Sequence, residues 1–276
     1  MPVLFDRSAE QMIFFDGHVH IYDCFDLDIF FHSAFENFSK AREEAGVAAA
    51  GIDFLLLTES TGCNFFAKLK TMADSGGEEH GRLWSVQRTE ERLSLLIVHQ
   101  KYPEPLVITA GRQLVTREGL ELSVLLTVAQ FPQVMDLAAA LTVVTSVGAV
   151  PVCPWGAGKW LGRRGRILAD YVRSGGRNDF FLGDSGVRPS IWWCPPLLIA
   201  AKAEQRMLAG SDPLPLSGEE RRVASFGGYC SGECSLKTPG ASLYQLIVDP
   251  GTKIFGYGRL QCPLTFVYKQ LLLRFN

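Results

Sequence analysis

Residues 12–22 read MIFFDGHVHIY, an apolar run that leads into two histidines two positions apart. The run predicts a buried strand, and the polar residues after it mark the end of that strand. Side chains two positions apart on a strand point to the same face, roughly 6.5 Å from one another along it. Because imidazole binds many divalent metals, His18 and His20 are candidate ligands of one shared ion. Asp16 is expected on the same face, where it could orient one of the rings.

Two later segments also consist of an apolar run that ends in polar residues and a Gly or Pro turn. They are FFLGDSG at residues 180–186, with Asp184, and MLAGSDP at residues 207–213, with Asp212. Functional groups of α/β barrels sit at the carboxyl ends of the strands. Both carboxylates are therefore expected to join the histidine pair as metal ligands and catalytic residues. An aspartate at a strand end is also a frequent turn or capping residue, and this alternative stays open.

The sequence offers few further candidate metal ligands. Glu59 ends the apolar run GIDFLLLTES and is a further candidate ligand and general base, although it could simply start the next helix. The histidines number five, and none follows His99. Strands after His99 can therefore offer only carboxylates, amides or thiols as ligands. The site can hold at most one metal ion, or two metal ions bound mostly by carboxylates. We expect one divalent ion, either zinc, manganese or iron.

A basic, glycine-rich segment is the candidate substrate-binding loop. Residues 154–166 read PWGAGKWLGRRGR and hold Trp155, Lys159 and Arg163. Glycines let backbone N–H groups approach an anion, and Lys or Arg side chains supply the charge. Arg188 follows another of the strand ends in a similar way. Together these residues predict an anionic small-molecule substrate, and the alternative is a solvated, basic start of a helix.

The composition narrows the class of protein. Of 276 residues, 47% are apolar and 20% are charged, which is typical of a folded domain rather than of disorder. The net charge of -2 favours neither nucleic acid nor an anionic membrane as a partner. No run of apolar residues is long enough to predict a membrane span, and the N-terminus lacks the pattern of a secretory signal. Seven scattered cysteines predict reduced thiols and a cytoplasmic protein, with a structural zinc at Cys230 and Cys234 as the less favoured alternative.

Apolar runs alternate with helix-like stretches along the chain, which predicts an α/β domain. Helices are expected near residues 28–45, 133–147, 163–174, 195–207 and 264–275. Residues 82–128 hold several β-like runs with short gaps, which predict hairpins. The tail after residue 213 is rich in glycine and is expected to be loop-like until its last helix. That apolar helix could pack on a second subunit, which leaves a homo-oligomer open.

Taken in order, these motifs resemble the polymerase and histidinol phosphatase (PHP) family, whose members are metal-dependent phosphoesterases similar in style to amidohydrolases. DGHVH at residues 16–20 matches the first motif, and AGSDP at residues 209–213 is similar to the last, with FLGDSG as a second possible equivalent. Other positions depart from the family pattern. Glu59, Ser60, Gln113 and Cys153 stand where the family has Asp, His, Glu and His, and Glu121 stands where it often has His.

The resemblance spans residues 13 to about 213. It implies a distorted TIM-like (β/α) barrel of about seven strands with a β-hairpin insertion. We therefore expect one PHP-like barrel domain over residues 1–276, with a loop and helix extension from about residue 214. The departures leave a reduced site of His18, His20 and Asp212, joined by Glu59 and Asp184.

Two hypotheses about function follow. In the first, the protein is a hydrolase that acts on a phosphate ester or another anionic small molecule through a metal-activated water. Glu59 or Asp184 would take the proton of that water, and Lys159 and Arg188 would neutralise the anion. In the second, the chain is a catalytically degenerate PHP-like barrel that binds a ligand or a partner. The surviving histidine pair favours the enzyme.

Overall fold

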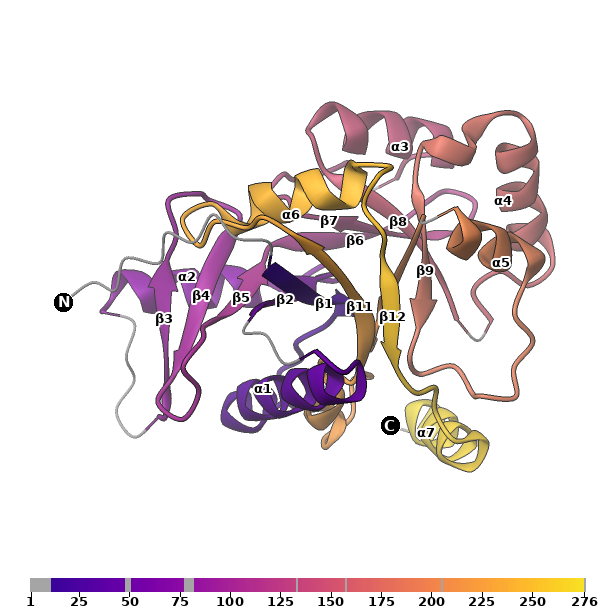
Figure 1. Cartoon of the computed structure of the whole chain (residues 1–276). Coiled ribbons are helices and arrows are strands. Elements are labelled where there is room, and N and C mark those ends of the chain that lie inside the picture. The colour runs from indigo at the N-terminus through magenta and orange to yellow at the C-terminus, as the bar shows by residue number, and fades with distance from the viewer. Residues whose placement is uncertain are drawn as a thin grey trace.

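The computed structural model describes residues 11–47, 51–76, 82–132, 134–156, 158–204 and 206–275. The strands within these ranges form two sheets (Figure 1). The seven-stranded sheet has the order β12-β11-β1-β2-β5-β4-β3, and the five-stranded sheet has the order β10-β9-β8-β7-β6.

The first sheet contains β1 (Gln11–Val19), β2 (Gly51–Leu57), β3 (Trp84–Arg88), β4 (Ser94–His99), β5 (Leu106–Thr109), β11 (Phe226–Gly232) and β12 (Phe255–Gly258). The second contains β6 (Gly111–Val115), β7 (Glu121–Leu125), β8 (Val150–Trp155), β9 (Phe181–Ser185) and β10 (Met207–Gly210). The α-helices are α1 (Leu27–Glu44), α2 (Phe65–Asp74), α3 (Leu137–Ser146), α4 (Arg163–Arg173), α5 (Pro196–Ala203), α6 (Pro239–Val248) and α7 (Pro263–Phe275).

The expectation of a TIM-like barrel of about seven strands is wrong. In the described part of the chain, the sheets keep open edges at β12, β3, β10 and β6 and do not close into one barrel. The reason lies at β1, which pairs with β2 in parallel on one side and with β11 in antiparallel on the other. The late strand β11 thus pairs with the edge of β1 to which β10 would pair in a closed barrel.

The tail after residue 213 is more ordered than its glycine content predicts, because β11, α6 and β12 all lie in it. Gly227 and Gly228 allow this arrangement. A Cβ at Gly227 would lie 2.2 Å from the carbonyl oxygen of Phe15, and one at Gly228 would lie 2.6 Å from the Phe15 ring. These glycines let β11 approach β1 closely, as strand glycines do where two backbones meet. The last helix, α7, is confirmed, and so are the antiparallel pairs β3/β4 and β6/β7.

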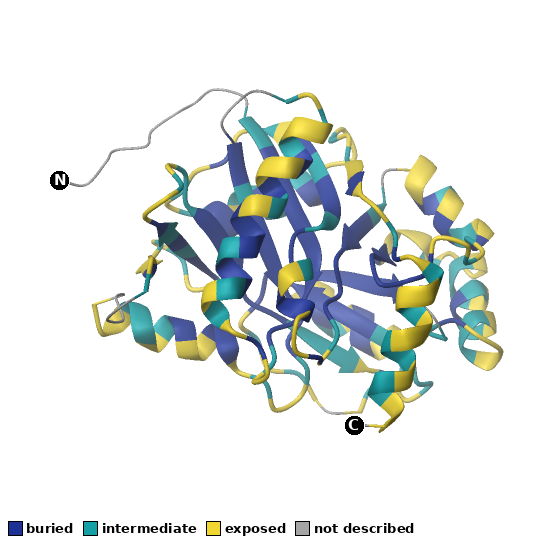
Figure 2. Ribbon diagram, turned by 90° about the horizontal axis from the view of Figure 1, so that it is seen from below, coloured by how far each residue is buried: buried dark blue, intermediate teal, exposed yellow. Residues whose placement is uncertain are grey.

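Both faces of β1 and β2 are covered, which explains their almost continuous apolar sequences. Phe14 and Leu55 pack against the phenylalanines of α1, whereas Phe15 and Leu56 belong to a cluster that also contains Val152 of β8 and the inner face of α6. The second sheet packs its other face on α3, α4 and α5. Figure 2 shows the buried strands between helices whose outer faces are exposed. The carboxyl ends of β1, β9 and β10 meet at the junction of the two sheets.

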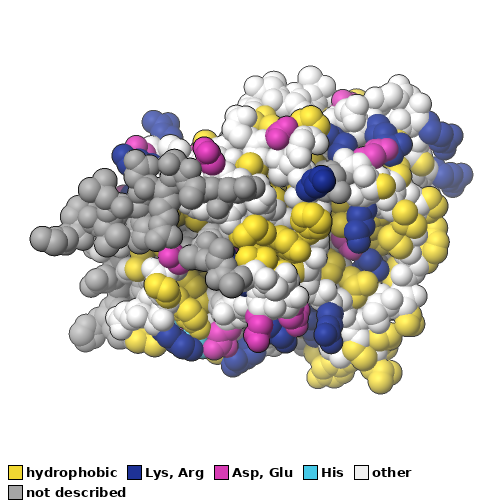
Figure 3. Space-filling model, viewed as in Figure 1, with side chains coloured by type: hydrophobic (Ala, Val, Ile, Leu, Met, Phe, Trp, Pro, Cys, Tyr) yellow, Lys and Arg dark blue, Asp and Glu magenta, His cyan; other side chains and the backbone are white. Residues whose placement is uncertain are grey.

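The last helix, α7, contains no buried residue. Its exposed apolar side chains are Leu264, Val267, Tyr268, Leu271 and Phe275. They recur at helical spacing and form a stripe, which appears at the lower right of Figure 3. Among the described residues, no helix is both long and apolar enough to cross a membrane.

Candidate metal centre

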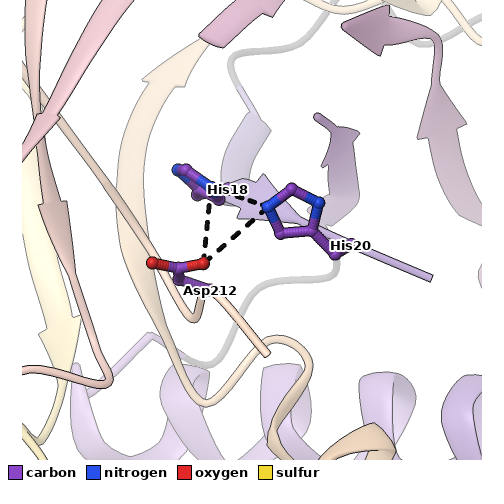
Figure 4. A group of neighbouring side chains, drawn as sticks. All are labelled: His18, His20 and Asp212. Atoms are coloured by element: carbon purple, nitrogen blue, oxygen red, sulfur yellow. Dashed lines mark hydrogen bonds and ion pairs between the residues drawn. The ribbon is translucent and has the colours of Figure 1, made fainter. Parts of the chain in front are cut away.

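The side chains of His18, His20 and Asp212 converge at the junction of the two sheets (Figure 4). The Nε2 atoms of the histidines lie 3.0 Å apart, and Asp212 Oδ1 lies 3.4 Å from His18 Nε2 and 3.8 Å from His20 Nε2. One ligand atom from each of the three residues thus falls within 4.8 Å of the others. All three residues are buried. The structure therefore brings together the two histidines and the aspartate that their positions at strand ends predicted.

A register shift in β1 aims the histidines into this junction. The pairing of β1 with β2 is irregular between Asp16 and Val19, as at a β-bulge. Phe14 and Val19 consequently pack in the same cluster beside α1, although strict alternation would put them on opposite faces. The shift turns His18 and His20 to the opposite side, between the sheets. Bulges next to functional sites commonly re-aim a side chain in this way.

Asp16 does not orient a ring, which corrects the expectation for this residue. Its carboxylate accepts backbone hydrogen bonds from Ser211 N and Ala224 N, each at 2.8 Å, and from His18 N at 3.2 Å. It also accepts a hydrogen bond from the Ser211 hydroxyl. Burial raises the pKa of Asp16 to about 7, against these hydrogen bonds, which lower it. Asp16 therefore fastens together the chain segments that carry the histidines and Asp212.

Asp212 reaches the histidines because the backbones of β1 and β10 touch. Asp212 N donates a hydrogen bond of 2.9 Å to His18 O. A Cβ on Gly210 would lie 2.2 Å from His18 N, so glycine is required there. Asp212 itself has a φ of 50°, in the left-handed region that Asp tolerates better than most residues. This turn directs its carboxylate to the two rings.

The protonation states suit a cation. Burial lowers the pKa of His18 to about 3 and that of His20 to about 4, although Asp212 acts against this shift. Burial alone would raise the pKa of Asp212, but Lys159 above all, together with the two histidines, holds it below its usual range. At neutral pH the group thus consists of two neutral imidazoles and one carboxylate, which are the forms that bind metals.

Lys159 and two further residues adjoin the three ligands. Lys159 Nζ lies 2.8 Å from Glu121 Oε2 and 3.4 Å from Asp212 Oδ2. The hydroxyl of Ser185 donates a hydrogen bond of 2.8 Å to Asp212 Oδ2. Lys159, predicted to bind substrate, is therefore part of the centre, and so is Glu121, which the family resemblance had singled out. Ser185 was not predicted from the sequence.

The faces of the strands explain why Ser185, and not Asp184, joins the centre. Phe181 of β9 packs between the sheets, and Ser185 shares its face because the two residues are four positions apart. Asp184 points to the opposite face and makes a buried, two-pronged ion pair with Arg188, with an Nη2–Oδ2 distance of 2.9 Å. The structure thus places neither Asp184 nor Arg188 in the group of ligands.

The same alternation removes two residues of β8 from the centre. Cys153 and Trp155 pack in the apolar cluster under α3, α4 and α5. Burial raises the pKa of the Cys153 thiol to about 12, which disfavours a metal-binding thiolate. The ring of Trp155 lies 5.2 Å from that of Trp160, with the two planes tilted by 49°, and Arg163 is exposed at the start of α4. The structure therefore places neither Trp155 nor Arg163 beside the three ligands.

Glu59 lies at the end of β2, but its carboxylate has other partners. It accepts hydrogen bonds from Phe66 N at 2.9 Å and from Arg112 at 3.1 Å. Asn64, the residue at the N-cap of α2, makes no capping hydrogen bond with its own side chain, so Glu59 serves the start of this helix instead. Burial raises the pKa of Glu59, partly offset by these contacts. Thr58, one residue earlier, places Oγ1 at 3.4 Å from His20 Nε2.

Within the described residues, His32, His99 and the cysteine pair lie away from the three ligands, and His99 Nδ1 accepts a hydrogen bond of 3.0 Å from Lys101 N. His32 pairs with Glu36 on the outer side of α1, and His80 lies outside the described residues. Cys230 and Cys234 are buried free thiols in the cluster between the sheets. Within the described ranges, they do not belong to any group of three potential ligands.

Comparisons with known proteins add little to this geometry. No protein-family model matches the chain, and no curated protein matches it. The crystal structure of PsfC from Pseudomonas syringae PB-5123 is similar, with 14% sequence identity and a TM-score of 0.45 over 95% of this chain and 99% of that one. A likeness at this level carries no argument about fold or function.

Proposed function

We propose that the protein is a metal-dependent hydrolase with one divalent ion on His18, His20 and Asp212. The observation that carries this proposal is the convergence of two imidazole nitrogens and one carboxylate oxygen in a buried site. Two histidines and one carboxylate form the ligand set of many catalytic zinc sites and non-haem iron sites, which keep further positions open. The described donors therefore fit a catalytic ion better than a fully closed structural one.

Each side chain has a distinct task in this scheme. A bound divalent ion would act as a Lewis acid and lower the pKa of a coordinated water. His18 and His20 would offer Nε2 and Asp212 would offer Oδ1, while Oδ2 of Asp212 accepts a hydrogen bond from Ser185 and pairs with Lys159. The charges of a divalent ion, Lys159, Asp212 and Glu121 add to one net positive charge. This balance favours an anionic substrate such as a phosphate ester.

The proton of the attacking water needs an acceptor, and we assign this role to Glu121. The side chain of Glu121 remains 27% exposed, beside Lys159. Glu121 pairs with Lys159, which belongs to the centre, whereas the carboxylates of Glu59 and Asp184 pair with Arg112 and Arg188 outside it. Glu121 is thus the carboxylate beside the three ligands that solvent can still reach.

The second hypothesis, a binding module without turnover, also has an observation in its favour. Both carboxylates predicted as general bases are neutralised by arginines. Such a module would bind the ion and an anion at the same residues. The two functions therefore agree on the metal and differ in whether an ester is cleaved.

Elemental analysis of protein purified without chelators tests the proposal. We expect about one equivalent of zinc, manganese or iron, lost in His18→Ala and His20→Ala. His32→Ala is the matched control, because His32 is a surface residue that pairs with Glu36, and it should keep the ion. Hydrolysis of p-nitrophenyl phosphate with each metal then separates the enzyme from the module. An ion content unchanged in both site variants would refute the assignment of ligands.

A further inference from the structure

The two oxygens of Asp212 serve two different kinds of partner. Oδ1 faces the Nε2 atoms of His18 and His20, at 3.4 and 3.8 Å. Oδ2 accepts from Ser185 and lies 3.4 Å from Lys159 Nζ. A carboxylate used in this way bridges two positive sites: the place of the proposed ion and the ammonium group of Lys159.

The ammonium group also joins a second carboxylate. Glu121 comes from β7, Asp212 follows β10, and Lys159 lies between β8 and α4, so three separate segments bring these charges together. Lys159 Nζ lies 2.8 Å from Glu121 Oε2. The exposed fractions of the side chains are 10% for Asp212, 18% for Lys159 and 27% for Glu121. The ammonium group compensates the charge of both carboxylates, of which Asp212 is the more buried.

We propose that the ammonium group of Lys159 occupies the position of a second cation and thereby limits the centre to one metal ion. This inference rests on the proposed function, because it presumes the ion on His18, His20 and Asp212. A lysine ammonium is a compact point charge with three donors, so it can stand between two carboxylates much as an ion does. In hydrolases with two metals, a shared carboxylate holds the ions a few ångströms apart, and Asp212 has this bridging arrangement.

Removal of the lysine side chain should uncover a site made of oxygens. Asp212 Oδ2, Glu121 Oε2 and the hydroxyl of Ser185 are the neighbouring donors. Oxygen ligands suit hard ions such as manganese and magnesium. The charge lost with Lys159 would leave Glu121 and the Oδ2 atom of Asp212 without their cation, which favours a divalent ion there. Lys159→Ala provides both the space and the charge deficit.

Equilibrium dialysis against Mn²⁺, followed by elemental analysis, measures the stoichiometry. We expect one Mn²⁺ per chain in the wild type and two in Lys159→Ala. Lys159→Met is the matched control, since it removes the charge but fills the space, and it should bind one. Lys159→Ala with Glu121→Gln removes a carboxylate from the new site and should return to one. Two Mn²⁺ ions bridged by Asp212 should also give a spin-coupled electron paramagnetic resonance spectrum, absent from the wild type.

The outcomes separate this inference from the proposed function. A wild type with one ion and a folded Lys159→Ala variant that also binds only one, without a coupled spectrum, would overturn the role of Lys159 alone. A wild type that already binds two would overturn it as well. A wild type that binds none would instead remove the proposed function. Circular dichroism of each variant verifies that it is folded.

Discussion

Gly210 sets how closely the backbone before Asp212 approaches His18. A methyl group at this position would lie 2.2 Å from His18 N, so the two segments must separate. We expect Gly210→Ala to lower metal affinity by about 10–100-fold, as changes in the support of ligands do. Overpacking should also destabilise the fold by about 1–3 kcal/mol. Metal titration and urea unfolding measure the two effects.

A second glycine provides the control for this substitution. A methyl group added to Gly256 in β12 would have its nearest neighbour at 3.8 Å, which is an ordinary contact. Gly256→Ala should therefore bind metal as the wild type does. Equal metal affinities in the two variants would contradict the close packing of β1 on β10 as the origin of the site.

Asp16 is expected to support the centre through the backbone. Its two oxygens accept from four donors, and an amide offers only one accepting oxygen. Asp16→Asn should destabilise the protein by about 1–3 kcal/mol, since buried donors lose their partner. It should also weaken metal binding, measured by titration, while Asp249→Asn in an exposed turn changes neither. Unaltered metal affinity in a destabilised Asp16→Asn protein would show that Asp16 serves the fold alone.

Part of the centre could be predicted from the sequence, and part could not. His18, His20, Asp212 and Lys159 do lie together. Asp184 was predicted as a ligand and Ser185 was missed, because β9 is buried on both faces and no alternation marks the inner one. The bulge that separates Asp16 from the rings left no signal in the sequence either.

At the scale of elements, Glu59 links the end of β2 to the start of α2. The carboxylate holds Phe66 N and Arg112, so Glu59→Gln should destabilise the fold by about 1–2 kcal/mol. The metal content should not change, because these partners keep Glu59 away from the ion. Thermal unfolding and elemental analysis measure both, with Glu36→Gln on the surface of α1 as the control. Loss of the metal from folded Glu59→Gln protein would restore Glu59 as a ligand.

The elements were predictable to different degrees. The helices near residues 28–45 and 163–174 and the antiparallel pairs within residues 82–128 followed from local periodicity and short gaps. The strand β11 did not, because its glycines favour a loop by local preference. These glycines matter through their contact with Phe15, more than 200 positions earlier, which no local pattern reveals.

For the whole molecule, the tail after residue 213 is part of the fold rather than an extension. β11 pairs with β1, and Ala224 N binds the carboxylate of Asp16. A chain that ends at residue 214 should therefore not fold, whereas a chain that ends at residue 262 loses only α7 and should fold and bind metal. Size-exclusion chromatography and circular dichroism compare the two. A folded, metal-binding chain of 214 residues would contradict the two-sheet arrangement.

The division into two sheets could not be predicted from the sequence either. The alternation of strands and helices indicated an α/β fold, but the edge at which β1 pairs depends on a strand near the end of the chain. Once β11 occupies this edge, β10 contacts β1 without a regular ladder. The centre lies at this contact, so the departure from a barrel and the position of the site have a common origin.

Anomalous diffraction would show whether a metal ion binds at the junction of the two sheets. Crystals grown with zinc or manganese would be measured on both sides of the absorption edge of the metal. We expect one anomalous peak, bonded to Nε2 of His18, Nε2 of His20 and Oδ1 of Asp212 at about 2.0–2.2 Å. The absence of a peak at these three atoms under saturating metal, or a peak only at the buried cysteines Cys230 and Cys234, would contradict the proposed metal centre.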